Sequence, residues 1–379
     1  MVPQTIFTED HDLFRRQVRR FMEEEVIPKT EKWEDQGYVD REAWLKAGEL
    51  GFLCTTMPAE YGGAEADRLY ATILIEEQAY AYSSGPGFSL HSDIVAPYIL
   101  NYGSEEQKAH WLPKMARGEA IGAIAMTEPG AGSDLQGVRT SAVEDGDDYI
   151  LNGSKIFITN GWHSDIVVVV AKTGEVSGGA DQISLLLVEG DREGFRKGKP
   201  LKKVGLKAQD TCELFFDNVR VPKENLLGKQ NGGFGMLMHE LAWERLLIAI
   251  TSVAACEKMF EDTLEYVRER KAFGKPVATF QNTRFSMAEM KTEIEIGRVF
   301  LDKCLELELQ KKLTPETAAM AKYWLTDLQC KVADECVQLH GGYGYMWEYP
   351  VARAWADARV QRIYGGTNEI MKEIISRSL

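Results

Sequence analysis

The spacing of apolar residues divides this chain into three parts, and that division restricts the fold more than any other feature of the sequence. Residues 8–118 carry apolar side chains at the three- and four-residue intervals of amphipathic helices. From Ala120 the pattern changes to short apolar runs between turn signals such as Asn152-Gly153. From Asn231 the helical spacing returns. We therefore predict a mainly α fold with a central β domain, divided into an N-terminal α-helical domain (1–119), a middle β domain (120–229) and a C-terminal α-helical bundle (230–379).

The expected β-strands are short and have no helical segments between them, which favours a small barrel or sandwich over alternating βαβ units. The strands are predicted at Ala123–Met126, Tyr149–Leu151, Lys155–Ile158, Ile166–Ala171, Ile183–Val188, Glu213–Phe216 and Val219–Val221. The helices of the last part are predicted at Phe234–Arg270, Thr279–Lys311 and Pro315–Gln338, with a final helix starting near Thr367.

The first long helix of the C-terminal part carries a carboxylate in its apolar stripe. Leu237, Leu241, Glu244 and Ile248 follow one another at steps of four, three and four residues, which places them on one helical face. Burial would raise the pKa of Glu244 and suit it to proton transfer near neutral pH. The alternative is a solvated ion pair with Arg245 or a nearby lysine, since structural ion pairs imitate perturbed acids. On spacing alone the ion pair is the more common outcome.

Composition narrows the class of protein. A net charge of −14 on 379 residues argues against a broad nucleic-acid or anionic-membrane surface. The six cysteines lack Cys-x-x-Cys spacing, which suggests reduced thiols in an intracellular protein, and the histidine spacing makes no case for a metal. No apolar stretch is long enough for a membrane span. We expect a cytoplasmic bacterial protein, with a mature mitochondrial matrix protein as the alternative.

Two segments of the β domain could contact a ligand. Thr127–Asp134 follows a predicted strand and contains Gly130 and Gly132, whose backbone amides could approach a phosphate closely. It lacks the third glycine of a dinucleotide-binding fingerprint, and an ordinary hairpin turn is the simpler interpretation. In Lys155–Gly161 an aromatic, an aliphatic and a hydroxyl residue could form a wall for a flat ring, although such side chains are usually core.

Three further segments in the helical part are rich in glycine or basic residues. Gln338–Tyr345 is a helix end with more glycines than a helix stop requires. Tyr364–Glu369 places two glycines before a helix that Thr367 can cap, which is a natural site for a carbonyl or phosphate oxygen. Arg270–Lys275, together with Gln281, could contact a pyrophosphate or could be a solvated basic turn.

Taken together and in this order, the five segments resemble the acyl-CoA dehydrogenase family of flavoproteins along essentially the whole chain. The sequence is most similar to the long-chain branch of the family in Lys271–Lys275, Met320–Trp324 and Val337–Gly342. The resemblance implies a C-terminal four-helix bundle and a homotetramer built as a dimer of dimers. It also implies FAD bound between the β domain and the bundle, with its adenine half reaching the neighbouring subunit.

The resemblance also implies roles for individual residues. Met126, Thr127 and Ser133 would line the flavin and its phosphates, and Phe157 and Thr159 would flank its ring. The residues expected to reach the partner's FAD are Arg270, Phe273, Gln281, Gln338, Gly341 and Gly342, and those that complete the FAD site are Thr367 and Glu369. The residues expected to contact the substrate are Ser133, Arg245, Gly365 and Gly366.

The position of the base departs from the pattern of many family members. These carry the catalytic Glu immediately after the tyrosine of the Tyr-x-Gly-Thr motif, where this chain has Gly365. The long-chain and isovaleryl branches place the base at the position matching Glu244, followed by an Arg matching Arg245. Two smaller departures are Phe157 in place of a tryptophan and the bulky Trp243 just before the base. Glycine at one position and Glu at the other predict that Glu244 is the catalytic base.

The predicted reaction is the FAD-dependent α,β-dehydrogenation of a fatty acyl-CoA of medium or long chain to the trans-2-enoyl-CoA, as in fatty acid β-oxidation. Glu244 would remove the α-proton, and the backbone N–H of Gly365 would polarise the thioester carbonyl. Electrons would pass to an electron-transfer flavoprotein. Two alternatives are an acyl-CoA oxidase-type reaction and a non-catalytic acyl-CoA-binding flavoprotein on the same scaffold. The preferred chain length and branching, the pathway and the electron acceptor are not fixed by the sequence.

Overall fold

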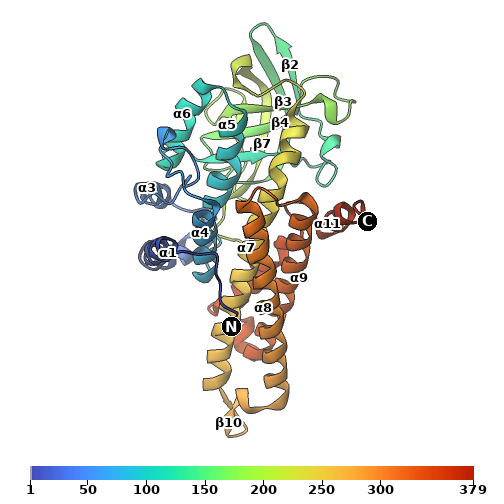
Figure 1. Cartoon of the computed structure of the whole chain (residues 1–379). Coiled ribbons are helices and arrows are strands. Elements are labelled where there is room, and N and C mark those ends of the chain that lie inside the picture. The colour runs from blue at the N-terminus through green and yellow to red at the C-terminus, as the bar shows by residue number, and fades with distance from the viewer. Residues whose placement is uncertain (1) are drawn as a thin grey trace.

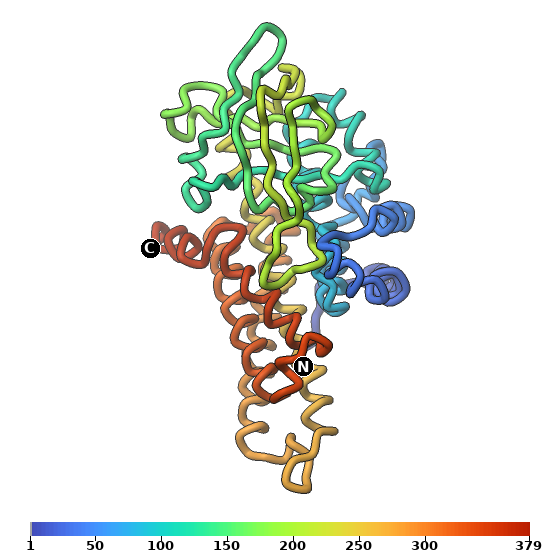
Figure 2. The backbone as a smooth tube through the Cα atoms, turned by 180° about the vertical axis from the view of Figure 1, so that it is seen from behind, coloured from blue at the N-terminus to red at the C-terminus, as the bar shows by residue number. Residues whose placement is uncertain are grey.

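The molecule is elongated, with a β domain at one end and a long helical bundle extending from it (Figure 1). The computed structural model describes residues 2–379. The N-terminal helices flank the junction of the β domain and the bundle, and the view from behind agrees with this arrangement (Figure 2). These helices are α1 (Glu9–Phe21), α2 (Thr30–Gln36), α3 (Arg41–Glu49), α4 (Arg68–Tyr80), α5 (Ala96–Tyr102) and α6 (Glu105–Ala116).

The β domain is a single sheet with eight strands, two of them very short. Its strands are β1 (Gly122–Ala125), β2 (Ser141–Asp145), β3 (Asp148–Thr159), β4 (Ile166–Lys172), β5 (Ile183–Glu189), β6 (Phe195–Lys197), β7 (Thr211–Pro222) and β8 (Leu226–Leu227). β4 is buried at every residue because its two faces contact different cores. Val167 and Val169 face the interior of the β domain, whereas Val168 and Val170 pack with the N-terminal helices and with Leu237.

The predicted α fold with a central β domain is confirmed, but the barrel alternative is wrong. The described strands run in the order β6-β7-β3-β2-β4-β5-β8, with β1 beside β4, and the two end strands do not pair. The link between β2 and β4 is a single residue pair, Ser141 with Lys172, so the two parts of the sheet are joined there by a narrow contact. The strands predicted as separate runs at Tyr149–Leu151 and Lys155–Ile158 are one strand, β3, interrupted by irregular register against β7.

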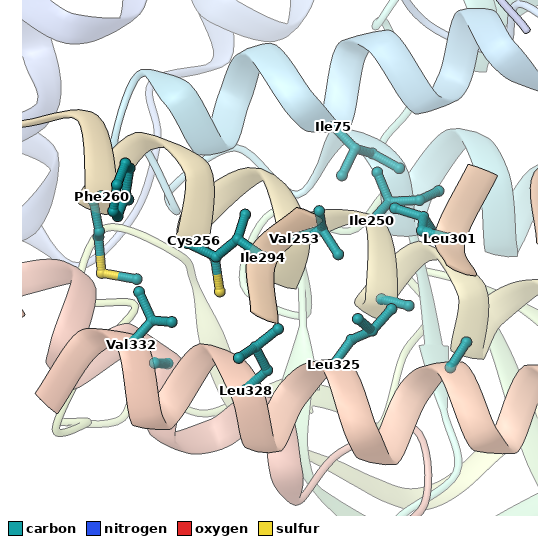
Figure 3. Close-up of a cluster of buried hydrophobic side chains, with 14 of the residues drawn as sticks. Ile75, Ile250, Val253, Cys256, Phe260, Ile294, Leu301, Leu325, Leu328 and Val332 are labelled. Atoms are coloured by element: carbon teal, nitrogen blue, oxygen red, sulfur yellow. The ribbon is translucent and has the colours of Figure 1, made fainter. Parts of the chain in front are cut away.

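The C-terminal part is a bundle whose helices share one apolar core. It consists of α7 (Gly233–Glu269), α8 (Gln281–Leu309), α9 (Pro315–His340), α10 (Pro350–Ala358) and α11 (Asn368–Ser376), with a small hairpin of β9 (Lys271–Ala272) and β10 (Lys275–Pro276). Figure 3 shows Val253 and Cys256 of α7 facing Leu325 and Leu328 of α9, with Ile250 beside Ile75 and Leu301. α10 was missed because its nine residues are too few for a clear period. No helix among residues 2–379 is both long and apolar enough to cross a bilayer.

A buried ion-pair network ties α4 to the bundle. The Arg298 guanidinium, 5% exposed, donates to Glu76 of α4 at 2.6 Å and to Glu257 of α7 at 2.8 Å. Arg15 of α1 also contacts Glu76, at 2.7 Å. These charges, which outweigh the cost of burial, hold the pKa of Glu76 below its usual range. Packing and ion pairs together therefore fix the position of α4 against α7.

We predict that Arg298→Met lowers the free energy of unfolding by about 3 kcal/mol, because it leaves buried carboxylates without their main cation. The measurement is thermal unfolding, with Arg20→Met as the matched control. Arg20 pairs with Glu24 on the surface, so its removal should cost about 0.5 kcal/mol or less. Equal effects of the two substitutions would contradict the assigned role of the network.

Candidate active site

Glu244 is buried in the first half of α7. Glu244 is 7% exposed, and its Oε1 accepts a hydrogen bond of 2.9 Å from the hydroxyl of Tyr98 on α5. Burial raises the pKa of Glu244 to about 7, the Tyr98 hydrogen bond opposes that rise, the charge of Glu240 adds to it and Arg245 opposes it. The solvated ion-pair alternative is therefore wrong, and the carboxyl group can hold or release a proton near neutral pH.

A second carboxylate lies one helical turn before Glu244. The Oε1 atom of Glu240 accepts hydrogen bonds of 2.9 Å from the side chains of Asn101 and Tyr102 on α5. Tyr98 and Tyr102 are themselves one turn apart, so two tyrosines face two glutamates across the α5–α7 contact. Sequence reasoning missed these donors, because spacing within each helix does not reveal which helices pack together. The contact fixes the orientation of the Glu244 carboxyl group.

The turn at Gly365 contacts the same face of α7. Gly365 has a φ of +65°, and an added Cβ would lie 2.4 Å from Cδ1 of Ile248. Ile248 is one turn after Glu244, so the glycine turn lies directly beside the carboxylate face. A glycine is favoured at this position both by its backbone conformation and by the close contact.

A buried lysine secures the glycine turn. Lys322 of α9 donates to the carbonyl oxygen of Gly366 at 2.8 Å and to Oδ1 of Asn368 at 3.0 Å. Burial, together with the charge of the neighbouring Arg245, lowers the pKa of Lys322 to about 8. Lys322 lies in the Met320–Trp324 segment, for which the sequence indicates only a similarity to the long-chain branch of the family. Its 0% exposure is what identifies a structural role.

The other predicted residues near this turn fall into two kinds. Arg245 is buried, burial lowers its pKa, and its Nε finds no hydrogen-bond partner among residues 2–379. Thr367 caps α11 by accepting from the backbone N–H of Ile370 at 3.3 Å, as predicted from the sequence, and Glu369 lies in the first turn of that helix. The turn, its helix and Arg245 thus surround one end of the Glu244 face.

The glycine-rich loop after β1 is held by an internal lysine. Lys155 of β3 is fully buried and donates to the carbonyl oxygen of Met126 at 3.0 Å and to Glu128 at 2.9 Å. The N–H of Ile156 donates to the carbonyl oxygen of Thr127 at 2.9 Å. These contacts fix Met126 and Thr127, while Ser133 further along the loop is exposed. Glu128 and Lys155 were missed, since their pairing depends on the loop conformation.

Phe157 is turned out of the β domain. The register of β3 against β7 shifts between Lys155 and Ile158, Phe157 has a φ of +61°, and its side chain is 65% exposed. Ile158 is buried, so the core alternative holds for the isoleucine and is wrong for Phe157. Thr159, two residues later, is half-buried. An exposed aromatic at a strained backbone position is a natural wall for a flat ligand.

The remaining predicted residues lie at the other end of the bundle. The guanidinium of Arg270 lies 5.5 Å from the ring centre of Tyr343, which brings the Arg270–Lys275 segment to the Gly341–Gly342 turn. Phe273 is 94% exposed in the β9–β10 hairpin, which is far from the β domain (Figure 1). Twenty-six residues of helix separate Arg270 from Glu244, which is roughly 39 Å. The exposed residues in this group are Arg270, Phe273, Gln281, Gln338, Gly341 and Gly342.

The helical part holds a carboxylic acid with a raised pKa beside a glycine turn, and the β domain offers an exposed aromatic and a glycine-rich loop. These features are typical of one class of protein, an oxidoreductase that holds a substrate between an acid–base residue and a flat cofactor. Comparison with protein families gives the particular family. The acyl-CoA dehydrogenase N-terminal, middle and C-terminal domains match residues 8–119, 123–219 and 231–379. The chain belongs to the acyl-CoA dehydrogenase family, as the sequence motifs predicted.

Individual relatives and a solved structure support the same family assignment. A protein named long-chain specific acyl-CoA dehydrogenase, mitochondrial, from Sus scrofa is 60% identical over 375 residues, covering 99% of this chain and 87% of that protein. An acyl-CoA dehydrogenase of Bacillus subtilis (strain 168) is 38% identical, covering 98% of both chains. The crystal structure of an acyl-CoA dehydrogenase from Geobacillus kaustophilus superposes with a TM-score of 0.97 at 50% identity, covering 99% of each chain.

Members of this family are FAD-dependent oxidoreductases, so the predicted enzyme class and cofactor are confirmed. The residues present fit FAD. Phe157 offers an exposed aromatic face, and a Cβ added at Gly130 or Gly132 would meet no atom within 4 Å. That open space lets backbone amides approach a phosphate.

We predict that Tyr98→Phe raises the pKa of Glu244 by about one unit, because a hydrogen bond that stabilises the charged form is lost. A base acts in its ionised form, so activity rises with pH through this pKa. The acidic limb of kcat/KM against pH should move to higher pH, and activity near neutrality should fall. The matched control is Tyr102→Phe, which removes a donor to Glu240. An acidic limb that stays in place in Tyr98→Phe would contradict the assignment.

Proposed function

We propose that Glu244 is the general base that removes the α-proton of a fatty acyl-CoA and that the product is the trans-2-enoyl-CoA. The observation that carries this proposal is the burial of its carboxyl group beside the Gly365 turn. A carboxyl group with a pKa of about 7 is half ionised near neutral pH and is a stronger base than an exposed glutamate. The backbone N–H of Gly365 is the proposed donor to the thioester carbonyl. One such donor contributes about 3 kcal/mol of transition-state stabilisation.

We place the acyl chain along α7. Glu244, Ile248, Thr251 and Ala255 follow at steps of four, three and four residues and share one helical face. Thr251 and Ala255 line a cavity of about 130 Å³ that also reaches Tyr364, the residue before the Gly365 turn. We propose that the acyl chain enters this cavity from the side of Tyr364 and the Gly365 turn, which contacts the Glu244 face. This arrangement supports a medium- or long-chain substrate, in keeping with the name of the Sus scrofa relative.

FAD, when bound, supplies the acceptor for the hydride that leaves the β-carbon. Phe157 and Thr159 are proposed to flank its ring, and Met126, Thr127 and Ser133 to bind along the loop after β1. Thr367 and Glu369 complete the site near the Gly365 turn. Arg245, Gly366 and Ser133 are proposed substrate contacts. Closure of this site by the acyl chain excludes water and strengthens each polar contact.

We propose that the second group of residues binds the FAD of a neighbouring subunit. Arg270, Phe273 and the Gly341–Gly342 turn are exposed at the far end of the bundle, and a single chain holds them roughly 39 Å from the proposed base. The proposed assembly is a homotetramer, a dimer of dimers. The proposed electron acceptor is an electron-transfer flavoprotein, and the proposed location is the bacterial cytoplasm, with the mitochondrial matrix as the alternative.

An acyl-CoA oxidase-type reaction would use the same residues but would pass electrons to oxygen. Release of peroxide during turnover identifies that reaction. A non-catalytic acyl-CoA-binding role is disfavoured by the intact carboxylate and its hydrogen-bond donor Tyr98.

We predict that Glu244→Gln retains FAD but loses acyl-CoA-dependent bleaching of the flavin absorbance by at least about a thousandfold in rate, because the amide cannot accept the α-proton. The measurement is stopped-flow absorbance under anaerobic conditions with a long-chain acyl-CoA. The matched control, Glu240→Gln, alters the neighbouring carboxylate and should retain bleaching. A fully active Glu244→Gln protein would refute the assignment.

We predict that Arg270→Gln weakens FAD retention about tenfold, because a guanidinium contact to a pyrophosphate of the neighbouring subunit is lost. The measurement is the FAD-to-protein ratio after gel filtration at increasing dilution. Lys312→Gln, an exposed cation on the loop after α8, serves as the control. Unchanged FAD retention in Arg270→Gln would contradict the cross-subunit site.

A further inference from the structure

The cavity lined by Thr251 and Ala255 also has polar side chains in its wall. It is lined by apolar residues such as Ile75 and Ala255, but Ser83, Gln329 and Asp357 also face it. Ser83 and Gln329 are each 2% exposed. Neither Oγ of Ser83 nor Oε1 of Gln329 has a hydrogen-bond partner within the part of the chain that the structure describes. These two residues come from different elements, the segment after α4 and the middle of α9, so two independent parts of the fold bring unpaired polar atoms to one cavity.

Unpaired buried polar atoms are unfavourable, and a purely alkyl occupant cannot pair them. A serine hydroxyl can donate or accept, whereas the Gln329 oxygen only accepts. The pair therefore matches a group that donates one hydrogen bond and accepts another. A neutral hydroxyl has both capacities.

The charge of the cavity favours a hydroxyl over a carboxylate as the bound group. Asp357 lines the same cavity and accepts a hydrogen bond from the backbone N–H of Leu206. Burial raises the pKa of Asp357 to about 6, so at neutral pH most of this side chain is ionised. A second carboxylate on the substrate would be repelled here, whereas a hydroxyl would not.

The distance along α7 gives the position of the hydroxyl on the chain. Thr251 and Ala255 are seven and eleven residues beyond Glu244, which is roughly 10 to 16 Å along the helix axis. Carbon–carbon bonds of about 1.5 Å advance an extended alkyl chain by about 1.25 Å each. The part of the cavity lined by Thr251 and Ala255 therefore lies about eight to thirteen carbons beyond the α-carbon.

We propose that Ser83 and Gln329, in the wall of the acyl cavity, form a hydroxyl-recognition site and that the enzyme prefers long-chain acyl-CoAs with a hydroxyl group distant from the thioester. The inference rests on the proposed function, because it assumes that the acyl chain runs along α7 from Glu244. It adds a substrate class to that function: mid- or late-chain hydroxyacyl-CoAs.

The test compares tetradecanoyl-CoA with tetradecanoyl-CoA that carries a hydroxyl at about carbon 12, using the FAD-loaded enzyme and an artificial electron acceptor. We expect kcat/KM for the hydroxylated substrate to be about tenfold higher, which is the effect of one hydrogen bond gained. The change should come from a lower KM. In Ser83→Ala and in Gln329→Met this preference should fall toward one. An unchanged thermal unfolding midpoint and FAD content show that the variants fold.

The control variant is Ser164→Ala, a buried serine of the β domain whose hydroxyl already donates to Gly161 at 2.9 Å. It should leave the preference unchanged. Equal kcat/KM for the two substrates would overturn the inference, since ordered water would then pair these atoms. A preference that survives in both Ser83→Ala and Gln329→Met would also overturn it, because these side chains would then not bind the hydroxyl. A tridecanedioyl-CoA preferred over both would overturn it in favour of an ω-carboxyl site. Failure of the wild-type enzyme to oxidise any acyl-CoA would instead contradict the proposed function.

Discussion

The burial of one carboxyl group against α5 is the constraint on which the active site depends. Burial removes water from Glu244 and raises its pKa to about 7. The single hydrogen bond from Tyr98 opposes that rise. An exposed glutamate would be ionised but weakly basic, and a fully paired one would be ionised and unreactive. The α5–α7 contact keeps Glu244 between these extremes, because it provides one donor and excludes solvent.

The rest of the architecture maintains that contact. The Glu76–Arg298 pair holds α4 against the bundle, and the shared apolar core packs α7 against α8 and α9. Lys322 fixes the Gly365 turn from α9, and Lys155 fixes the loop after β1 from β3. In both places a buried lysine binds carbonyl oxygens of a glycine-rich segment, so that segments without regular structure are held in one conformation.

Much of this could be predicted from the sequence, because the signals are local. The helix expected at Phe234–Arg270 is α7 at Gly233–Glu269, and the last helix begins at Asn368 after the predicted cap at Thr367. The face that carries Glu244 also followed from its spacing. The donor Tyr98, the lysines Lys155 and Lys322 that hold the two glycine-rich segments, and the open sheet could not be predicted, since each depends on which distant segments meet. Phe157 shows the limit within one strand, because a register shift against β7 sends it outward where simple alternation could not.

The central claim is that Glu244 titrates near neutral pH in the folded protein. Infrared difference spectra of wild-type protein minus Glu244→Gln, recorded between about pH 5 and pH 9, test it directly, because a protonated carboxyl group has a carbonyl band that the carboxylate lacks. The account predicts one such band that disappears with a midpoint near pH 7. A carboxylate that stays ionised down to the lowest pH of the series would contradict it.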